Sequence, residues 1–397
     1  MDRTAILARL DQLEIETPSW GYANSGTRFG VFVQPAAART VTEKLEDAAT
    51  VHRFTACCPS VALHIPWDDT DDWAAARADA AALGIRIGAI SPNVFQEQCY
   101  KYGSFGHRDP KVRRKAIDMH LRCIQIAVAT GSRDVSCWFA DGTNYPGQDD
   151  FRERRQRFRD CFAEVHAALP AGKRLLIEYK FFEPAFYHTD LCDWGQSALL
   201  CKRLGPQAQV LVDTGHHAQG TNLQHIVASL IDEGLLGGFH FNARKYADDD
   251  LTVGSIDPYE MFLIFDELVA AEQDADAAVR TAAADVAYMF DQSHNLKDKI
   301  EATIQSALFV QEVFAKALGV DRAALRRARE AHDIIAAEEC LRSAFFTDVK
   351  PLLADWRRAK GIDPDPLAAF RRSGYTAAKA AERTVRHGAA ATGSGHQ

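Results

Sequence analysis

Short apolar runs rich in β-branched and aromatic residues recur along the chain, separated by amphipathic, alanine-rich stretches. This alternation is typical of a parallel sheet in which each strand is followed by a crossover helix. Eight such runs occur, at residues 28–33, 61–67, 85–91, 134–140, 174–180, 209–217, 237–244 and 286–294. Successive runs begin about 37 residues apart, which suits a βα unit with a generous loop. Eight near-equal units predict a (β/α)8 TIM barrel.

The stretches between the runs carry helix signals. Residues 71–84, 109–131 and 150–169 each begin with an Asp, and the first two end at a Gly, as helix caps do. A doubly wound open sheet is the competing fold. Its phosphate-binding fingerprint G-x-G-x-x-G is absent from the sequence, so we favour the barrel.

The barrel is expected to end with a helix at 301–320. Residues 1–320 then form a catalytic barrel with a short N-terminal helix, and residues 321–397 form a helical C-terminal extension. The last ten residues, GAAATGSGHQ, have no apolar period and predict a flexible tail. The pattern leaves open whether the extension wraps a neighbouring subunit.

The composition indicates which kinds of partner the protein is expected to lack. The chain has 46 Lys and Arg against 54 Asp and Glu, a net charge of −8, and no basic block, which argues against nucleic acid. Nine cysteines without a C-x-x-C spacing suggest reduced core thiols rather than a disulfide framework or zinc knuckle. The sequence shows neither a signal peptide nor a membrane-length apolar run, so we expect a soluble, cytoplasmic protein with no membrane partner.

Polar residues follow four consecutive predicted strands, at the face where a (β/α)8 barrel places its active site. These residues are Glu178, Lys180, Asp213, His216, His217, His240, Asn242, Asp291 and His294, together with Asp248, Asp249 and Asp250 in the loop after the seventh strand. A single carboxylate at a strand end is usually solvated or caps a helix. Carboxylates and imidazoles that converge on one barrel mouth are costly to desolvate unless a cation lies among them, so a divalent metal is predicted.

The spacing favours two metal ions. One set, from adjacent strands, is Glu178, Asp213, His240 and Asp291; the other is His216, Asp248 and Asp250, and Asp213 can bridge both. Oxygen-rich ligation assisted by imidazole suits Mn²⁺, Mg²⁺ or Co²⁺. The simpler alternatives are a strand-to-helix turn with surface histidines at DTGHH (213–217) and a solvated acidic loop at 248–250. His217 and Asp249, adjacent in sequence to predicted ligands, are expected to point away.

Longer motifs resemble a known family. They are EYK (178–180), LVDTGHH (211–217), GFHFNARKYADDDLTVGSIDPY (238–259), FDQSHN (290–295), VALHIPWD (61–68), CYKYGSFGHRDP (99–110) and CWFADGTNYPGQ (137–148). Together they are similar to the broad-specificity bacterial L-rhamnose isomerases, within the xylose isomerase-like barrel superfamily, over about residues 20–330. One departure is the stretch 271–295, which is longer and richer in alanine than this pattern, and the N-terminal region is shorter.

The resemblance implies a sugar isomerase of carbohydrate metabolism, in rhamnose catabolism. It places the first metal set around a structural, substrate-orienting ion and the second set around a catalytic ion, with two Mn²⁺ per subunit of a homotetramer. The implied reaction interconverts an aldose and its 2-ketose, with L-rhamnose to L-rhamnulose as the first expectation.

For the mechanism we expect a metal-assisted 1,2-hydride shift, with a proton-transfer enediol route as the rival. His64 is expected to assist ring opening, Lys180 to donate to the sugar oxygen at C1, and Asp250 to be catalytic. Trp67, Trp138, Lys180 and His216 are expected to bind the substrate, although His64 and both tryptophans could equally be core residues. Phe29 and Asp68 are weaker candidates for pocket closure and for accepting a sugar hydroxyl.

Other functions stay open at this point. A sugar epimerase or an inosose dehydratase would share the barrel and the metal site, and a non-catalytic barrel that only binds metal or sugar is the alternative from another class. A nuclease is disfavoured because the chain lacks a basic groove.

Overall fold

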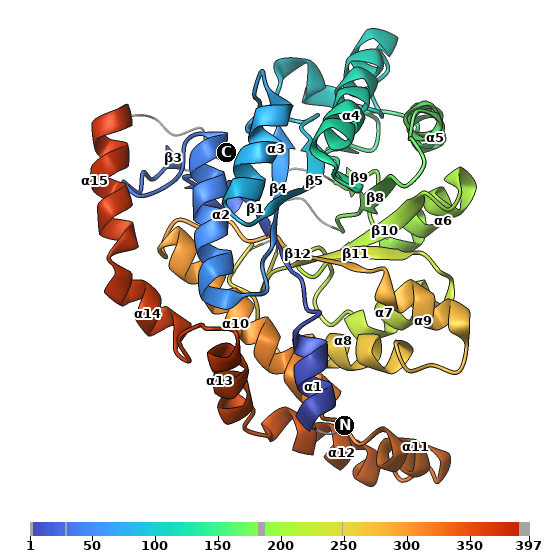
Figure 1. Ribbon diagram of the computed structural model, residues 1–397. Helices are drawn as coiled ribbons and strands as arrows, with labels where there is room; N and C mark the ends of the chain where they lie inside the picture. The colour runs from blue at the N-terminus through green and yellow to red at the C-terminus, as the bar shows by residue number, and fades with distance from the viewer. Residues whose placement is uncertain (1–2, 28–29, 182–186, 248, 389–397) are drawn as a thin grey trace.

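The computed structural model describes residues 3–27, 30–181, 187–247 and 249–388, and its centre is a closed barrel of eight parallel strands (Figure 1). The strands pair around the barrel in the order β1-β12-β11-β10-β8-β6-β5-β4. The barrel strands are β1 (Glu16–Pro18), β4 (Ser60–Ile65), β5 (Arg86–Pro92), β6 (Asp134–Cys137), β8 (Arg174–Glu178), β10 (Ala208–Asp213), β11 (Leu236–Phe241) and β12 (Ala287–Phe290). The predicted TIM barrel is therefore confirmed.

Helices surround the barrel (Figure 1). They are α2 (Val41–Thr55), α3 (Trp73–Ala82), α4 (Pro110–Thr130), α5 (Phe151–Ala167), α6 (Trp194–Leu204), α7 (Leu223–Asp232), α8 (Pro258–Ala271), α9 (Ala277–Ala284) and α10 (Lys299–Leu318). Asp residues cap many of them. The carboxylates of Asp72, Asp150 and Asp193 accept backbone N–H groups at the starts of α3, α5 and α6, which is why Asp marks these starts in the sequence.

The prediction of the first strand at 28–33 is wrong. The first barrel strand is β1, whereas β2 (Gly26–Thr27) and β3 (Gly30–Val31) form a small antiparallel pair outside the barrel. β1 is only three residues long and runs directly into a 3₁₀ helix, Ser19–Tyr22, so it shows no apolar run. The apolar segment that suggested a strand instead leaves Phe32 57% exposed.

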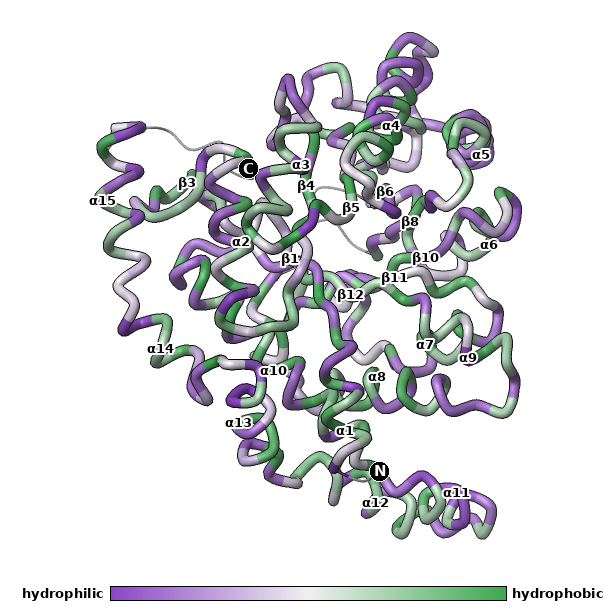
Figure 2. Tube along the Cα trace, viewed as in Figure 1, coloured by the Kyte–Doolittle hydropathy of each residue, from purple (hydrophilic) through white to green (hydrophobic). Residues whose placement is uncertain are grey.

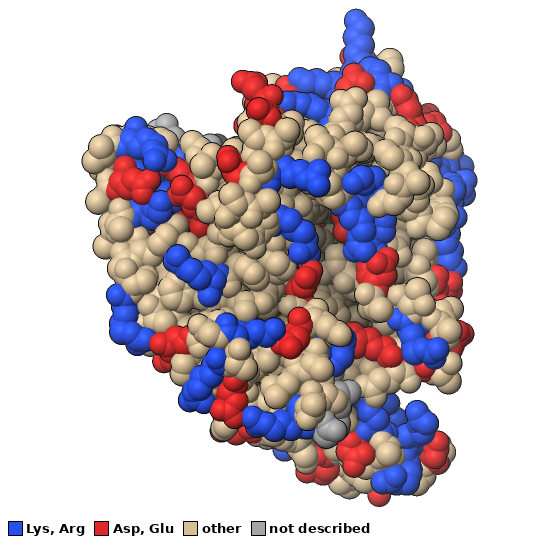
Figure 3. Space-filling view, viewed as in Figure 1, with Lys and Arg blue, Asp and Glu red and all other residues tan. Residues whose placement is uncertain are grey.

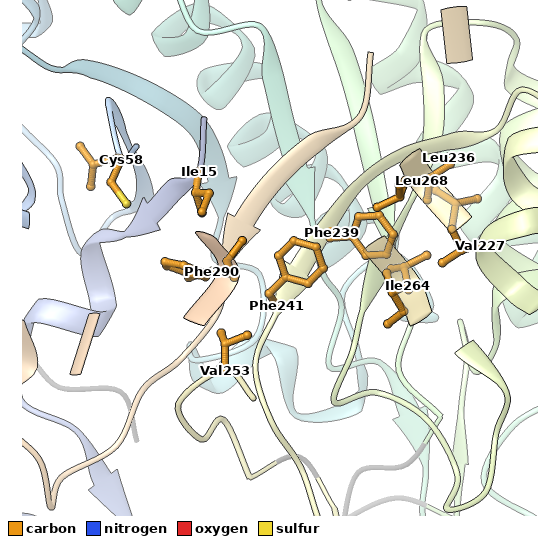
Figure 4. Packing of buried hydrophobic residues seen from close by; sticks show 14 of the residues in the cluster. Ile15, Cys58, Val227, Leu236, Phe239, Phe241, Val253, Ile264, Leu268 and Phe290 are labelled. Carbon is orange, nitrogen blue, oxygen red and sulfur yellow. The ribbon is translucent and has the colours of Figure 1, made fainter. Parts of the chain in front are cut away.

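Side chains alternate along the barrel strands, and this divides the core into two parts. Inward-facing residues form a small cluster inside the barrel, which contains Trp20, Ala62, Ala89, Leu176, Leu211 and Met289. Outward-facing residues pack against the helices: Phe239 and Phe241 of β11 stack with ring centroids 4.8 Å apart, and Phe290 of β12 lies beside them (Figure 4). The apolar colouring in Figure 2 recurs along the strands and on the helices that cover them.

Outside the barrel, α1 (Arg3–Leu10) precedes β1, and a short antiparallel pair joins β7 (Gly142–Thr143) to β9 (His188–Thr189). The helices that follow the barrel are α11 (Arg322–Glu330), α12 (Ile334–Phe346), α13 (Lys350–Ala359), α14 (Pro366–Ser373) and α15 (Tyr375–His387). They run past α10 to the side of α2 (Figure 1). Residues 389–397, most of the predicted tail, lie outside the described residues.

Two further features bear on partners. No helix in the described ranges combines the length and apolar character needed to cross a bilayer. On the face seen in Figure 3, Lys and Arg are interspersed with Asp and Glu, without a broad area of one sign.

Candidate metal centre

The predicted ligands of the first metal stand on four adjacent strands, one layer above the apolar cluster inside the barrel. Glu178, Asp213 and Asp291 each come two residues after an inward-facing residue of that cluster, namely Leu176, Leu211 and Met289. His240 comes from the strand between β10 and β12, where β11 pairs it directly with Asp213. The period of two along each strand therefore aims all four side chains at the barrel axis.

The four side chains meet in one cluster. Glu178, Asp213, His240 and Asp291 each offer a ligand atom, and these atoms all lie within 4.8 Å of one another. The Nδ1 atom of His240 is 3.2 Å from Oε1 of Glu178 and 3.4 Å from Oδ2 of Asp291. The first three residues are buried and Asp291 is partly so. This is the arrangement expected from the sequence.

The electrostatics of the cluster indicate a cation site. Burial by itself lowers the pKa of His240, but the carboxylates of Glu178, Asp291 and Asp213 outweigh it and raise the pKa to about 9. The structure thus favours positive charge at the centre of the cluster. Carboxylates and imidazole together are a donor set for Mn²⁺, Mg²⁺ or Co²⁺. The residues present fit a divalent metal.

His216 and His217 return from the sharp turn after β10 toward different neighbours. Nδ1 of His216 is 3.0 Å from the backbone oxygen of Tyr179 and 3.2 Å from Oε1 of Glu178, and its Nε2 is 3.9 Å from Oδ2 of Asp213. Nε2 of His217 instead lies 2.6 Å from the hydroxyl of Tyr179. As expected, His216 faces the cluster formed by Glu178, Asp213, His240 and Asp291, and His217 points away from it.

The loop after β11 is held against the cluster by Asn242. Its amide nitrogen donates to both carboxylate oxygens of Asp213, at 3.0 and 3.1 Å, and lies 3.5 Å from Oδ1 of Asp250. This brings Asp250 to the side of Asp213, as a second site would require. Asp249 binds the backbone N–H groups of Lys245 and Tyr246, so it points away as expected. Asp248 lies outside the described residues.

Trp20 is a site residue that the sequence analysis missed. Its indole Nε1 donates to Oδ1 of Asp291 at 2.7 Å, and its ring makes edge contacts with His64 and His240 at centroid distances of 5.6 and 6.5 Å. Trp20 follows β1, the strand placed wrongly, so no strand-end signal pointed to it. The tryptophan orients a ligand carboxylate and covers the cluster on one side.

A group of aromatic side chains adjoins the carboxylate–imidazole cluster and is linked to it through Trp20. His64 at the end of β4 packs against Trp67, with ring centroids 4.0 Å apart, and Phe95 makes edge contacts with both His64 and Trp138. Nζ of Lys180 lies 5.1 Å from the centre of the Trp138 ring. The structure brings together four residues predicted for the substrate: His64, Trp67, Trp138 and Lys180.

This aromatic group also contains a buried polar atom without a hydrogen-bond partner among the described residues. The indole Nε1 of Trp138 is buried and makes no hydrogen bond within the described residues, whereas that of Trp67 donates to Gln96 at 2.7 Å. An unsatisfied buried donor is costly, and a bound hydroxyl would satisfy it. Burial, with Lys44 and His240 adding to it, lowers the pKa of His64 to about 3, so its imidazole is neutral at pH 7.

The carboxylate of Asp68 is occupied by protein partners and is not free to accept a sugar hydroxyl, so that weaker expectation is wrong. Its carboxylate is buried and pairs with Lys44 on α2, and it also accepts the hydroxyl of Ser19 and the backbone N–H of His64. The partners were not visible in sequence because they lie on other elements. Phe29, the other weaker candidate, lies outside the described residues.

Comparison with known sequences agrees with this geometry. A family model described as a xylose isomerase-like TIM barrel matches residues 50–269. A protein named probable sugar isomerase in Rhizobium meliloti strain 1021 is 45% identical over 388 residues, covering 96% of this chain and 89% of that protein. A second, with the same description in Mesorhizobium japonicum, is 43% identical over 384 residues, covering 96% and 88%.

Solved structures share the fold at low sequence identity. An L-ribulose 3-epimerase structure matches with a TM-score of 0.57 and 16% identity, covering 81% of this chain and 98% of that one. A D-psicose 3-epimerase structure matches with a TM-score of 0.51 and 15% identity, covering 78% and 99%. At this identity the likeness establishes the barrel alone.

Proposed function

The chain belongs to the xylose isomerase-like TIM barrel family, and on that premise we propose that it is a metal-dependent aldose–ketose isomerase acting on a free sugar, with L-rhamnose and L-rhamnulose as the first pair to assay. One observation carries the proposal: a largely buried quartet of three carboxylates and an imidazole beside a group of aromatic side chains that Lys180 contacts. Both relatives described above are named as sugar isomerases, which supports the reaction class without specifying the sugar.

Two metal positions are proposed. Glu178, Asp213, His240 and Asp291 would hold one divalent ion, and His216, Asp248 and Asp250 a second, with Mn²⁺ as the first candidate for both. Bound there, a divalent cation supplies Lewis-acid polarisation of sugar oxygens. The contact of Asn242 with both Asp213 and Asp250 supports the pairing of the two positions.

The protein groups have distinct tasks in this proposal. A neutral His64 can hydrogen-bond to the ring oxygen or anomeric hydroxyl and so assist ring opening, because its low pKa keeps it unprotonated. Lys180 donates to the sugar oxygen at C1, where negative charge develops. Trp67 and Trp138 pack against the C–H face of the sugar, and His216 contacts it from the side of Tyr179.

Hydrogen transfer between C1 and C2 is proposed to occur as a 1,2-hydride shift. A reaction run in deuterated water distinguishes this from the enediol route, since a hydride shift carries no solvent deuterium to carbon. Ketose without deuterium at C1 supports the shift. Deuterium at C1 would show that a protein base exchanges the proton and would replace the shift with the enediol route.

The substrate is tested with a panel of L-rhamnose, mannose, allose, lyxose and xylose, with Mn²⁺ added and products separated by chromatography. A ketose product supports an isomerase. An epimer with its carbonyl in the original position would identify an epimerase, and loss of water would identify a dehydratase. Asp250→Asn is expected to lower turnover by at least about a hundredfold, and unchanged turnover would remove Asp250 from the catalytic set.

We further propose that the chain forms a homotetramer. Exposed apolar residues on α12 support a subunit contact there, because Ile334, Ile335 and Phe346 are 70–75% exposed. Light scattering on the purified protein tests this. A monomer at micromolar concentration would contradict it.

A further inference from the structure

The last helix that the structure describes, α15, is attached to the rest of the protein largely by ion pairs and hydrogen bonds, and Tyr375 at its start also packs against the apolar core. Among the residues of α15, only Arg383 is buried, and Val385 is 88% exposed. Arg383 donates two hydrogen bonds to Asp47 of α2, at 2.8 and 2.9 Å, and the hydroxyl of Tyr375 donates to the same carboxylate at 2.9 Å. Acidic and basic side chains accordingly lie next to one another over α15 (Figure 3). The position of α15 depends on these ion pairs.

A second acidic residue of α2 strengthens the attachment. Glu43 accepts hydrogen bonds from Arg386 at 2.9 Å and from Nε2 of His387 at 2.8 Å, and Lys379 pairs with Glu46 at 2.7 Å. Glu43 and Asp47 are both buried. A buried carboxylate that loses its cation is strongly destabilised, so these ion pairs favour the seating of α15 on α2.

Residues at the C-terminal end of α15 also hold residues 34–40, the segment that leads into the start of α2. Arg383 also donates to the backbone oxygen of Ala36, and the guanidinium of Arg39 donates to the backbone oxygen of Gly388 at 3.3 Å. Residues 34–40 are therefore tied to α15 at two points. This segment is the continuation of the chain from Trp20 and the β2–β3 pair.

Residues 34–40 in turn hold the loop that begins with Asp291. The amide of Gln34 donates to the backbone oxygens of Asn295 and Lys297, both at 3.0 Å. From α15 itself, the hydroxyl of Thr376 donates to Asp298 at 2.9 Å. The C-terminal helix is thus joined to residues 291–298, the loop that follows the fourth predicted metal ligand, directly through Thr376 and indirectly through residues 34–40.

The inner side of α2 is connected to His64 through Asp68. Lys44, one residue from Glu43, pairs with Asp68, and Asp68 holds both the hydroxyl of Ser19 and the backbone N–H of His64. Lys44 and Asp68 are 2% and 1% exposed. A displacement of α2 would therefore be transmitted to the residue before Trp20 and to His64.

We propose that α15 is a positioning element of the catalytic mouth, with Arg383 as its central positioning residue. The helix fixes residues 34–40 and 291–298, and through α2 it fixes the approach of Ser19 and His64. The C-terminal extension is then needed for a formed active site as well as for any subunit contact. The kinetic part of this inference rests on the proposed isomerase function, whereas its structural part does not.

Hydrogen exchange measured by mass spectrometry tests the structural part. Arg383→Met leaves the buried Asp47 without its cation, and we expect exchange in 34–40 and 291–298 to become about tenfold faster or more, with β4, β8 and β10 unchanged. Arg372→Met is the matched control, because Arg372 is an exposed arginine on α14. Arg383→Lys keeps the charge and is expected to restore most of the protection.

Truncation after Ser373 removes α15 and provides a second variant. It should accelerate exchange in the same two segments as Arg383→Met does. Unchanged exchange in these segments in both variants would overturn the proposal. Equal loss of protection throughout the barrel would also overturn it, since α15 would then stabilise the whole fold rather than the mouth.

Metal affinity and kinetics complete the test. Titration calorimetry with Mn²⁺ should show about tenfold weaker binding in Arg383→Met, the loss typical of removing support behind ligands. KM should rise by about fivefold or more while kcat falls less. If no aldose is converted by the wild type, the proposed function fails, while exchange and Mn²⁺ binding still decide the role of α15.

Discussion

Gly215 lies very close to the side chains of the predicted metal site. A Cβ atom at this position would lie 2.7 Å from Oδ1 of Asn242 and 3.1 Å from Oδ1 of Asp213, and the Gly215 N–H donates to Asp213 at 2.6 Å. A larger residue at this position would have to displace the amide of Asn242 from its place beside Asp213. The glycine in DTGHH therefore leaves room for Asn242 and Asp213 beside the turn.

Gly215→Ala is predicted to weaken Mn²⁺ binding by about tenfold, because the added methyl group pushes Asn242 away from Asp213. Calorimetric titration measures the effect. Gly147→Ala is a matched control, since a Cβ there meets nothing within 4 Å. Equal affinity in the two variants would contradict the close fit.

Glu16 is a second residue whose environment is set by a missing side chain. Its carboxylate lies over Gly88, where a Cβ would come within 1.4 Å of Oε2, and it accepts the backbone N–H of Ala89 at 2.9 Å. Burial raises the pKa of Glu16 to about 7, with the nearby Asp134 adding to the effect. The folded protein thus holds this proton more tightly than the unfolded chain does.

The raised pKa of Glu16 predicts a pH-dependent stability. Because the folded-state pKa exceeds the unfolded one, the free energy of unfolding falls as pH rises from about 4.5 to about 7 and then levels. Glu16→Gln keeps the acceptor oxygen without the charge, so it should be more stable than wild type at pH 8, by about 1–3 kcal/mol, and similar at pH 4.5. Urea unfolding at both pH values measures this, and a variant less stable at pH 8 would refute the argument.

Residues were predictable from the sequence where a strong local pattern accompanied them. Glu178, Asp213, His240 and Asp291 each end an apolar strand, so the period of two placed them on the inner face. Trp20 was missed because β1 has no apolar run, and Asp68 was misread because its cation, Lys44, lies 24 residues away on another element. A single sequence does not show which residues of different elements contact one another.

At the scale of elements, the helices that back the ligand-bearing strands set the rigidity of the site. Phe241, the residue after His240, packs on Phe265 of α8 with ring centroids 5.4 Å apart, and Phe265 in turn meets Phe314 of α10 at 5.8 Å. All three rings are buried. The alternation that aims His240 inward therefore also anchors β11 to two helices.

Phe265→Ala is predicted to lower the free energy of unfolding by about 3–5 kcal/mol, since it leaves a cavity between α8, α10 and β11. Phe151→Ala serves as the control, because that side chain is 44% exposed and its loss should cost less than about 1 kcal/mol. Chemical denaturation of both variants measures the difference. Similar losses would show that the cluster around Phe265 is not a rigid anchor.

The long stretch before β12 illustrates the limits of prediction for elements. Its unusual length is accounted for by α9, which packs on α7 and α8. The helix precedes β12, so it lies toward the opposite end of that strand from Asp291. The insertion was visible as alanine-rich sequence, but its position relative to the site required the strand boundaries.

For the whole molecule, the regular spacing of apolar runs was enough to predict a closed barrel even though one of the eight runs was misplaced. The number of barrel strands was right because β1 lies shortly before the run that was taken for the first strand, and the other seven runs overlap barrel strands. The spacing of the apolar runs did not predict that α15 is attached through buried ion pairs. Charged residues read as surface in a sequence, and only the fold shows that Arg383 is buried.

The central claim is that the carboxylate and imidazole cluster holds a divalent metal that the isomerisation requires. The most direct measurement is conversion of L-rhamnose to L-rhamnulose by protein stripped with EDTA, before and after Mn²⁺ is returned, with Asp213→Asn in parallel. We predict no ketose after stripping, full recovery with Mn²⁺, and at least about a thousandfold lower turnover in the variant. Full activity in the presence of EDTA, or undiminished turnover in Asp213→Asn, would contradict the account.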